Sequence, residues 1–226
     1  YLHNPAGFFD RLKFVLPLIK TDYVALIGDD EFYLPSALES CISKLDSDQD
    51  YVACCGRSLG FTCYSGKVYG YDQYAGFANY ALENDDRFQR TIDHFSNYMP
   101  SLLYAVTQSS LWKKIFENIL KREFGVGAIV EIQYQMLCCF AGKSIVLPQL
   151  YWLRSKENTP IRDTDPSLDR NNAIEKWWKD LDQEIVRSEF LTQMASGLSD
   201  VLSLNNEKVE PQKLLNLVQE SMNKFV

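Results

Sequence analysis

The sequence has no apolar run that approaches the ~18 residues a membrane-spanning helix needs, and it does not open with a charged-then-apolar leader. We therefore expect a protein that is soluble, or one that contacts a membrane only at its surface. The chain begins with Tyr1 instead of Met. We expect from this that the natural protein starts upstream of residue 1.

Basic residues are too few for a protein that binds nucleic acid. Lys and Arg number 23 against 30 Asp and Glu, which gives a net charge of -7. Because proteins bind the phosphate backbone mainly through Lys and Arg, this balance argues against nucleic acid as a partner. It is compatible with an acidic site that holds a cation, or with a ligand that arrives with one.

Cysteine pairs with the spacing of a metal site are also missing. The six cysteines include no C-x-x-C pair, and four of them form two adjacent pairs, Cys54-Cys55 and Cys138-Cys139, inside apolar runs. Cysteines in such runs behave as small hydrophobic residues. We expect reduced thiols in a cytoplasmic protein, and neither a zinc site nor a disulfide framework.

The composition that remains is that of a folded protein, with 46% hydrophobic and 13% aromatic residues. Apolar residues at helical spacing predict helices at 5–20, 35–45, 72–82, 85–97, 109–121, 129–140, 171–196 (with an extension to 204) and 211–225. Short apolar runs predict strands at 22–28, 51–55, 102–107, 144–148 and 150–153, and a hairpin at 59–71.

This order predicts an α/β fold with a mixed sheet flanked by helices and a helical C-terminal extension. We assign residues 1–155 to the sheet domain and residues 171–226 to the helical region. Residues 156–170 (KENTPIRDTDPSLDR) are polar and contain two prolines, which is typical of a linker or mobile loop.

Three carboxylates follow the first predicted strand, in the stretch IGDDEFYLP. Asp29, Asp30 and Glu31 would lie outside the carboxyl end of that strand, where open α/β sheets bind their ligands. Clustered carboxylates raise one another's pKa unless a cation neutralises them, so Mn²⁺ or Mg²⁺ with a nucleotide diphosphate is one interpretation. The alternative is a solvated turn whose charges favour the start of the next helix.

This stretch resembles the metal-binding segment of family-2 glycosyltransferases with the GT-A fold, whose pattern is roughly D-x-D-D-x-x-x-P-x-x-L-E. With Pro35 aligned, the resemblance implies that Asp30 is the main metal ligand, assisted by Asp29 or Glu31, and that Asp29 and Asp30 contact the donor. Gly28 stands at the first Asp position of the pattern.

A second segment of the same family matches farther along the chain, so that the resemblance covers residues 3 to 154. It reads EIQYQML from Glu131, then AGKSIVLP, then YWLR ending at Arg154. The resemblance implies that Glu131 is the catalytic base. The acidic companion found in the family is Ile132 in this chain. A helix-start carboxylate with no catalytic role is the alternative for Glu131.

Together the two segments imply a glycosyltransferase of the hexosyltransferase type that inverts the anomeric centre. It would move a sugar from a nucleotide-diphosphate donor to a glycan or lipid-linked acceptor, with a divalent cation, in bacterial surface-polysaccharide synthesis. The resemblance further implies strands for the nucleobase before residue 5, and this chain has no room for them. We therefore expect a truncated chain, or a departure from the family, with weak donor binding by this chain alone.

Several other residues are weaker candidates. Arg57, which follows the second predicted strand, is assigned to the donor phosphates, and Arg87, Arg90 and Arg154 are further cations that could meet phosphate or acceptor groups. His94 is expected to be a surface or half-buried imidazole. A cluster of tyrosines could stack on sugar rings or pack the predicted hairpin; its members are Tyr64, Tyr69, Tyr71 and Tyr74.

Two other functions stay open beside the transferase. One is a non-catalytic or truncated relative that keeps the fold as a binding or assembly module. The other is a metal-dependent phosphoryl-transfer enzyme, which no phosphate-binding Gly-rich loop supports. The apolar stripe of the last helix predicts packing or homo-oligomer contacts, and peripheral contact with the inner membrane is the further alternative. The stripe consists of Leu214, Leu215, Leu217, Val218 and Met222.

Overall fold

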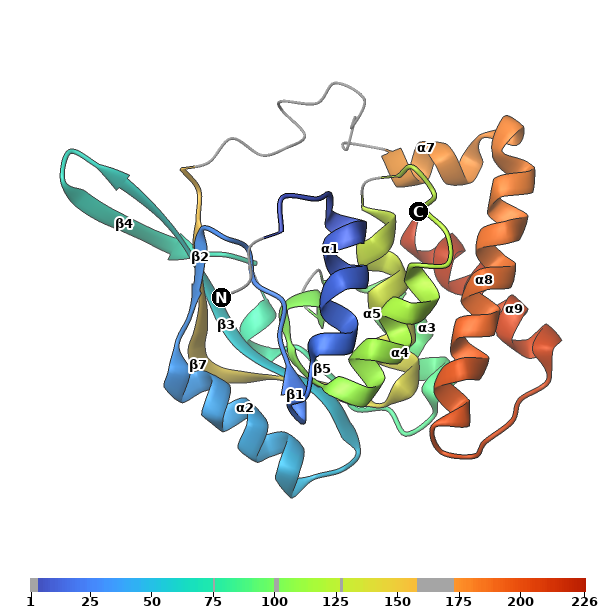
Figure 1. The fold of residues 1–226 in the computed structure, drawn as a ribbon, viewed down its shortest axis with the longest axis horizontal. Helices are drawn as coiled ribbons and strands as arrows, with labels where there is room; N and C mark the ends of the chain where they lie inside the picture. Colours follow the sequence, from blue (N-terminus) through green and yellow to red (C-terminus); the bar gives the residue numbers. More distant parts are fainter. Residues whose placement is uncertain (1–3, 75, 100–101, 127, 158–172) are drawn as a thin grey trace.

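The computed structural model is an α/β fold in which helices flank a mixed, open sheet (Figure 1). It describes residues 4–74, 76–99, 102–126, 128–157 and 173–226. The strands of this described part are β1 (Tyr23–Val24), β2 (Glu31–Tyr33), β3 (Tyr51–Tyr64), β4 (Lys67–Asp72), β5 (Ala81–Leu82), β6 (Val106–Gln108) and β7 (Lys143–Ser155). Its helices are α1 (Phe8–Val15), α2 (Pro35–Ser47), α3 (Arg87–Ser96), α4 (Ser109–Ile119), α5 (Ile129–Ala141), α7 (Ala173–Lys179), α8 (Glu184–Ser203) and α9 (Pro211–Phe225).

The sheet is built around the long strands β3 and β7. The strand order is β1-β6-β3-β7-β2, with β4 added to β3 and β5 added to β7. Strands β3 and β7 run parallel, and the other pairs among the described residues are antiparallel. Two register shifts between Gly56 and Ser58 mark an irregularity in the β3–β7 pairing.

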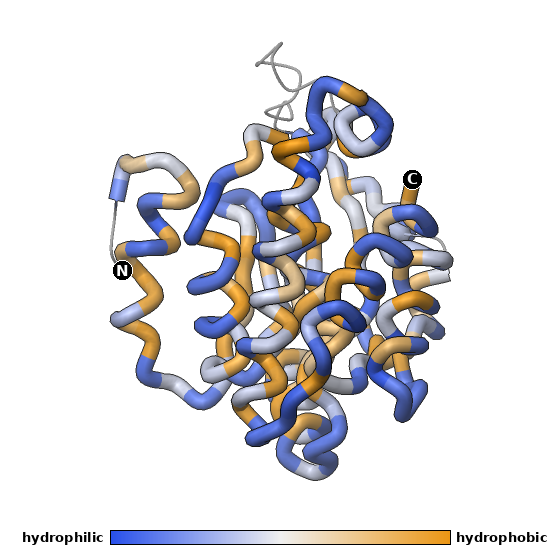
Figure 2. Tube along the Cα trace, turned by 90° about the vertical axis from the view of Figure 1, so that its right-hand side faces the viewer, coloured by the Kyte–Doolittle hydropathy of each residue, from blue (hydrophilic) through white to orange (hydrophobic). Residues whose placement is uncertain are grey.

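Helices cover the sheet on both faces because adjacent residues of β3 point in opposite directions. Cys54 meets Cys41 of α2, whereas Cys55 lies near Cys138 of α5. Helices α3, α4 and α5 form a layer with α8 and α9 outside it (Figure 1). Figure 2 looks onto this outer side, where hydrophobic and hydrophilic stretches alternate along each helix.

The two adjacent cysteine pairs are buried, as expected of small hydrophobic residues, and all six thiols are free. The stripe on α9 is buried within the chain itself, with Leu214, Leu217, Val218 and Met222 each 2% exposed or less. Across the described ranges, no helix is both long and apolar enough to cross a membrane.

Three sequence predictions about elements of the sheet were wrong. The run 22–28 was expected to be a strand of a parallel sheet, but only Tyr23 and Val24 form β1, which pairs antiparallel with β6. The expected helix at 72–82 is instead the end of β4, a short 3-10 turn (Phe77–Asn79) and β5. The runs 144–148 and 150–153, expected as two strands, form the single strand β7.

The predicted hairpin is confirmed and is longer than expected. Strand β3 continues to Tyr64, and β4 returns from Lys67 through a two-residue turn. Ser65 and Gly66 have φ values of 50° and 72°. Positive φ at both central residues is the geometry that matches the twist of two antiparallel strands. The hairpin projects from the body of the molecule (Figure 1).

Candidate functional site

The acidic triplet lies where the chain turns into β2. Asp29 and Asp30 form the turn, and Glu31 is the first residue of β2, with its backbone N–H donating to the Gly28 carbonyl over 3.3 Å. Asp29 is exposed, whereas Asp30 and Glu31 are partly buried. Strand alternation turns Glu31 inward and Phe32 outward, while Asp29 lies in the turn and faces solvent.

Glu31 is bound to two residues of the neighbouring strand β7. In the β2–β7 register Glu31 lies opposite Arg154, and its Oε1 is 3.2 Å from the Arg154 Nε. The Trp152 indole N–H donates to Glu31 Oε2 over 2.9 Å. The Glu31 side chain is only 7% exposed. Burial raises the pKa of Glu31, and the charge of Arg154 opposes this rise without cancelling it.

Aromatic residues enclose the guanidinium of Arg154. Its Nη1 donates to the Tyr74 hydroxyl over 2.5 Å, and its centre lies 5.4 Å from the Trp152 ring. The Tyr104 ring stacks on Trp152 at 4.3 Å between centroids. The Arg154 side chain keeps 30% of its surface exposed, so the guanidinium is held in one orientation but can still reach a ligand.

Glu131 approaches from the other side of the site, in the first turn of α5. Its Oε1 accepts a hydrogen bond from the Tyr98 hydroxyl at 2.8 Å and one from the Gln135 amide at 3.0 Å. The same Gln135 amide donates to the Tyr98 hydroxyl over 2.7 Å. The two donors hold Glu131 Oε1 in one orientation at the start of the helix.

Glu31 contacts Arg154, and Glu131 lies near enough to act on the charge of Arg154. Burial by itself lowers the pKa of Arg154, but the acidic groups that face it outweigh this effect and raise that pKa; they are Tyr74, Tyr104, Glu31 and Glu131. Glu31 and Glu131 also both raise the pKa of Tyr74. The two segments singled out by the sequence lie a hundred residues apart, but their glutamates act on the same two side chains, Arg154 and Tyr74.

The carboxylates do not by themselves form a metal cage. Within the described residues, no three Asp, Glu, His or Cys side chains are close enough to hold one metal ion. Glu31 is turned toward Arg154 and Trp152, which leaves Asp29 and Asp30 as the carboxylates of the turn. A hard cation such as Mg²⁺ needs only one or two carboxylates when phosphate oxygens complete its shell.

The other candidate cations are held elsewhere. Arg57 is exposed on β3 and pairs with Asp72 at 3.1 Å, and it lines a small hollow of about 80 Å³ together with Tyr74. Arg87 pairs with Glu207 at 2.9 Å. Arg90 is buried and donates to the backbone carbonyls of residues 84, 139 and 140. Arg87 and Arg90 thus have structural partners away from the site.

Sequence reasoning missed the residues that orient the two carboxylates. Trp152, Tyr98, Tyr104 and Gln135 make contacts that depend on strand register and helix packing across the chain. A usable signal for Trp152 was its place beside Arg154 in YWLR, because alternate residues of a strand share a face. Gln135 stands one helical turn after Glu131, which is the spacing of neighbouring side chains on a helix.

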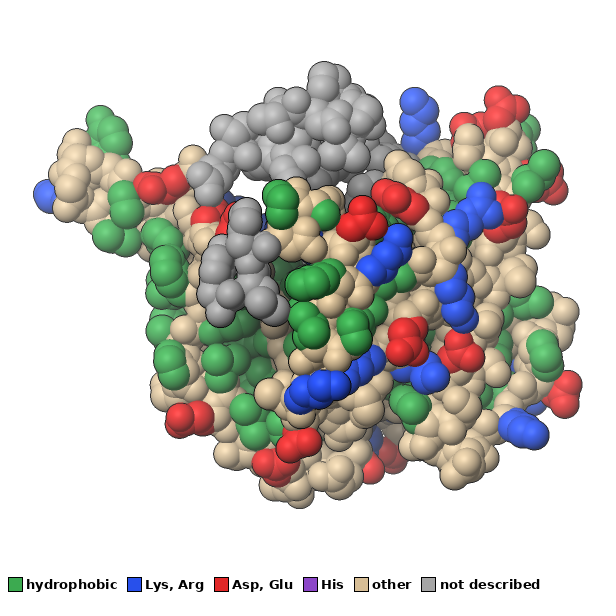
Figure 3. Space-filling view, in the orientation of Figure 1, with side chains coloured by type: hydrophobic (Ala, Val, Ile, Leu, Met, Phe, Trp, Pro, Cys, Tyr) green, Lys and Arg blue, Asp and Glu red, His purple; other side chains and the backbone are tan. Residues whose placement is uncertain are grey.

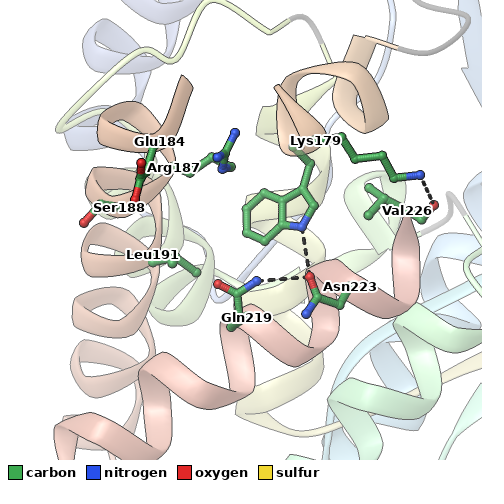
Figure 4. Close-up of a pocket in the computed structure, with 9 residues that line it drawn as sticks. Lys179, Glu184, Arg187, Ser188, Leu191, Gln219, Asn223 and Val226 are labelled. Carbon is green, nitrogen blue, oxygen red and sulfur yellow. Dashed lines mark hydrogen bonds between the residues drawn. The ribbon is translucent and has the colours of Figure 1, made fainter. Parts of the chain in front are cut away.

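A cavity lies elsewhere, between α7, α8 and α9 (Figure 4). It has a volume of about 790 Å³, and its lining includes Trp178, Arg187 and Gln219. The Trp178 indole N–H donates to Asn223 over 3.0 Å, and the Gln219 amide donates to the same oxygen. None of the predicted site residues lines this cavity. This cavity therefore lies apart from the candidate site.

Comparison with known proteins assigns neither a family nor a function to the chain. No family model matches the chain, and no curated protein matches it.

Proposed function

We propose that this chain is a metal-assisted glycosyltransferase of the GT-A type that transfers a sugar from a nucleotide-diphosphate donor with inversion. The observation that carries the proposal is the ion pair of Glu31 with Arg154 at 3.2 Å, with Glu131 near enough to act on the charge of Arg154. A transferase needs a cationic group for the leaving diphosphate and a base for the incoming hydroxyl within one site. The arrangement supplies both groups from the two segments that resemble the family.

The roles of the residues follow from their contacts. Glu131, oriented by Tyr98 and Gln135, would take the proton of the acceptor hydroxyl. The hydroxyl oxygen forms the new bond to the anomeric carbon as the bond from that carbon to the diphosphate breaks. Arg154 would hold diphosphate oxygens, since the planar guanidinium matches phosphate geometry. The acceptor attacks opposite the leaving group, which inverts the anomeric centre.

Asp30, with Asp29 beside it, would hold the Mn²⁺ or Mg²⁺ ion, which supplies positive charge to the departing diphosphate. Arg57, near Tyr74 in the small hollow, remains a proposed second contact to the donor. The acceptor is proposed to be a glycan or a lipid-linked sugar, and the reaction is proposed to occur in the bacterial cytoplasm or at the inner membrane.

The first test distinguishes the role of the proposed base from the roles of the residues that bind the donor. Nucleoside diphosphate release is measured with a panel of nucleotide sugars, Mn²⁺ and oligosaccharide acceptors, and UDP binding is measured by calorimetry. Replacing Glu131 by Gln should lower transfer by about 10²–10⁴-fold and leave UDP binding unchanged, because the base acts on the acceptor. Arg154→Gln and Asp30→Asn should weaken UDP binding in the presence of Mn²⁺.

A matched control is Arg122→Gln, because Arg122 also pairs with a glutamate, Glu189, but lies away from the site. This variant should bind and turn over like the wild type. Unchanged transfer in Glu131→Gln would refute the assignment of the base. If no nucleotide sugar is turned over, the proposed transferase is wrong for this chain.

A non-catalytic relative is the second candidate, and one observation favours it. Two acidic positions of the family pattern are occupied by Gly28 and Ile132, and Ile132 is buried at 1% exposure. A chain of this kind would bind nucleoside diphosphate or glycan without releasing product. This candidate would be supported if the chain bound UDP but turned over none of the nucleotide sugars.

A further inference from the structure

The hairpin β3–β4 has one face made of tyrosines. Cross-strand partners share a face, and the partners are Gly60 with Tyr71, Thr62 with Tyr69, and Tyr64 with Lys67. Tyr64, Tyr69 and Tyr71 therefore lie on the same side of the hairpin. They are 71%, 50% and 42% exposed. The alternative that the rings pack the hairpin holds for Tyr71, whose ring lies over Gly60, whereas Tyr64 and Tyr69 are half or more exposed.

This tyrosine face continues into the candidate site. In the parallel β3–β7 pairing Gly60 lies beside Arg154, and in the β2–β7 pairing Arg154 lies beside Glu31. The Tyr71 ring covers Gly60 so closely that a Cβ built there would come within 2.4 Å of it. From Arg154 outward, the same sheet face therefore carries Tyr71, then Tyr69, then Tyr64 near the tip.

The opposite face of the hairpin has a different character. It carries Phe61, which contacts the exposed Phe32 at 6.3 Å between centroids, and it carries Val68 near the tip. These side chains have no hydroxyl groups. The two faces offer a matched comparison, because Phe32 of the nearby strand β2 and Val68 of the hairpin are 57% and 70% exposed.

The chemistry of the tyrosine face fits a chain of sugars. A sugar ring has an apolar C–H face and polar edges, and tyrosine combines an aromatic face with a hydroxyl group. Tyr69 and Tyr71 are two residues apart on one strand, so their attachment points are about 7 Å apart along it. Lys67 is the one charged residue among the cross-strand pairs that form this face, which suits a ligand of low charge better than an anionic surface.

We infer that the tyrosine face of the hairpin binds an extended glycan whose reacting end lies at Arg154 and Glu131. The inference rests on the proposed function, because it identifies the acceptor as an oligosaccharide of several sugars. The hairpin would hold the part of the acceptor distant from the transfer, with the sugar rings stacked along Tyr71, Tyr69 and Tyr64.

The test compares the two faces with immobilised linear oligosaccharides of glucose, galactose, mannose and N-acetylglucosamine, one to eight sugars long. The double variant Tyr64→Ser, Tyr69→Ser should bind the longer oligosaccharides roughly tenfold more weakly than the wild type, because two stacking contacts are lost. The matched double variant Phe32→Ser, Val68→Ser should bind them like the wild type. Circular dichroism verifies that both variants are folded.

Each other outcome is decisive. The inference would be overturned if the wild type bound none of the oligosaccharides. It would also be overturned if both double variants lost the same binding affinity. Flotation with vesicles of phosphatidylethanolamine and phosphatidylglycerol, abolished by Phe32→Ser, Val68→Ser, would show instead that the hairpin contacts a membrane. UDP binding with Mn²⁺ should be the same in both variants. Failure of the tyrosine test with an intact Glu131 effect refutes the glycan face alone, and the reverse result refutes the transferase alone.

Discussion

At the scale of single residues, His94 shows how far burial can move an acid–base equilibrium. The imidazole is 0% exposed, its Nδ1 shares a hydrogen bond with the Tyr80 hydroxyl, and its ring packs against Phe95 and Tyr98. Burial lowers the pKa of His94 to about 4. The sequence prediction of a surface or half-buried imidazole was therefore wrong.

This shift makes stability depend on pH. The unfolded chain binds a proton at His94 near its ordinary pKa of about 6.5, while the folded chain stays unprotonated until about pH 4. The free energy of unfolding should therefore fall as the pH drops through this window, by roughly 2–3 kcal/mol from this group. Urea unfolding between pH 7 and pH 4 measures the slope.

Two variants isolate the histidine. His94→Gln should be less stable than the wild type at pH 7 and should lose less stability between pH 7 and pH 4. His3→Gln removes the other histidine of the chain and should keep the wild-type slope. Equal slopes in the wild type and His94→Gln would contradict the prediction.

The acidic triplet shows what residue patterns can and cannot predict. The sequence identified the three carboxylates and Arg154 as candidates, and it ranked Asp30 first because of the alignment on Pro35. It could not foresee that Glu31 pairs with Arg154, because that contact depends on the β2–β7 register. The register is fixed by backbone pairing between segments a hundred residues apart, which no local pattern encodes.

At the scale of elements, the crossing of α4 and α8 depends on a glycine. A Cβ built on Gly197 would lie 2.8 Å from the Asn118 side chain and 2.9 Å from Leu137. Asn118 donates to the Gln193 carbonyl over 3.2 Å, and the Gln193 amide donates to the Asn118 carbonyl over 2.8 Å. Close approach of the two helices is therefore tied to a reciprocal pair of hydrogen bonds.

Replacing Gly197 by Ala should lower the free energy of unfolding by about 1–3 kcal/mol, because the methyl group displaces the Asn118 amide from its bond. On an exposed helix face the same change would stabilise, since Ala favours helix by up to about 1 kcal/mol over Gly. Chemical denaturation measures whether the free energy of unfolding falls or rises in the variant. The neighbouring change Ser196→Ala, at an exposed position, should be neutral or slightly stabilising. A more stable Gly197→Ala would rule out this close crossing.

Helices were the elements that the sequence predicted best. Proline stands at the first position of α2 and α9, and both helices begin where it predicts because proline has no N–H to lose there. The short strands β1, β2 and β5 have two or three residues each, so they carry no periodic pattern. The break between α7 and α8 was missed because it follows from Asp180, whose side chain accepts from the Asp182 N–H.

At the scale of the whole molecule, the core runs without interruption from the sheet to the last helix. One cluster of buried side chains extends from Leu12 to Met222. The Phe225 ring at the end of α9 lies 4.8 Å from Tyr98 and 6.1 Å from Phe95. Since Tyr98 also donates to Glu131, the last helix supports the residue proposed as the base.

This continuity predicts one cooperative unfolding transition. All four tryptophans are buried, two in the sheet and α4 (Trp152 and Trp112) and two in α7 (Trp177 and Trp178). Thermal unfolding followed by tryptophan fluorescence and by far-ultraviolet circular dichroism should therefore give coincident midpoints. Two separated midpoints would instead support the predicted division into a sheet domain (1–155) and a helical region (171–226).

The projecting hairpin (Figure 3) has a consequence for how this molecule can change over evolutionary time. All six residues of β4 are exposed, so their side chains add little to the hydrophobic stabilisation of the core. Natural selection for a stable fold acts weakly on such positions. If the tyrosines recur in closely related chains, a ligand must preserve them, and the variation of β4 among species would then record which glycan each one meets.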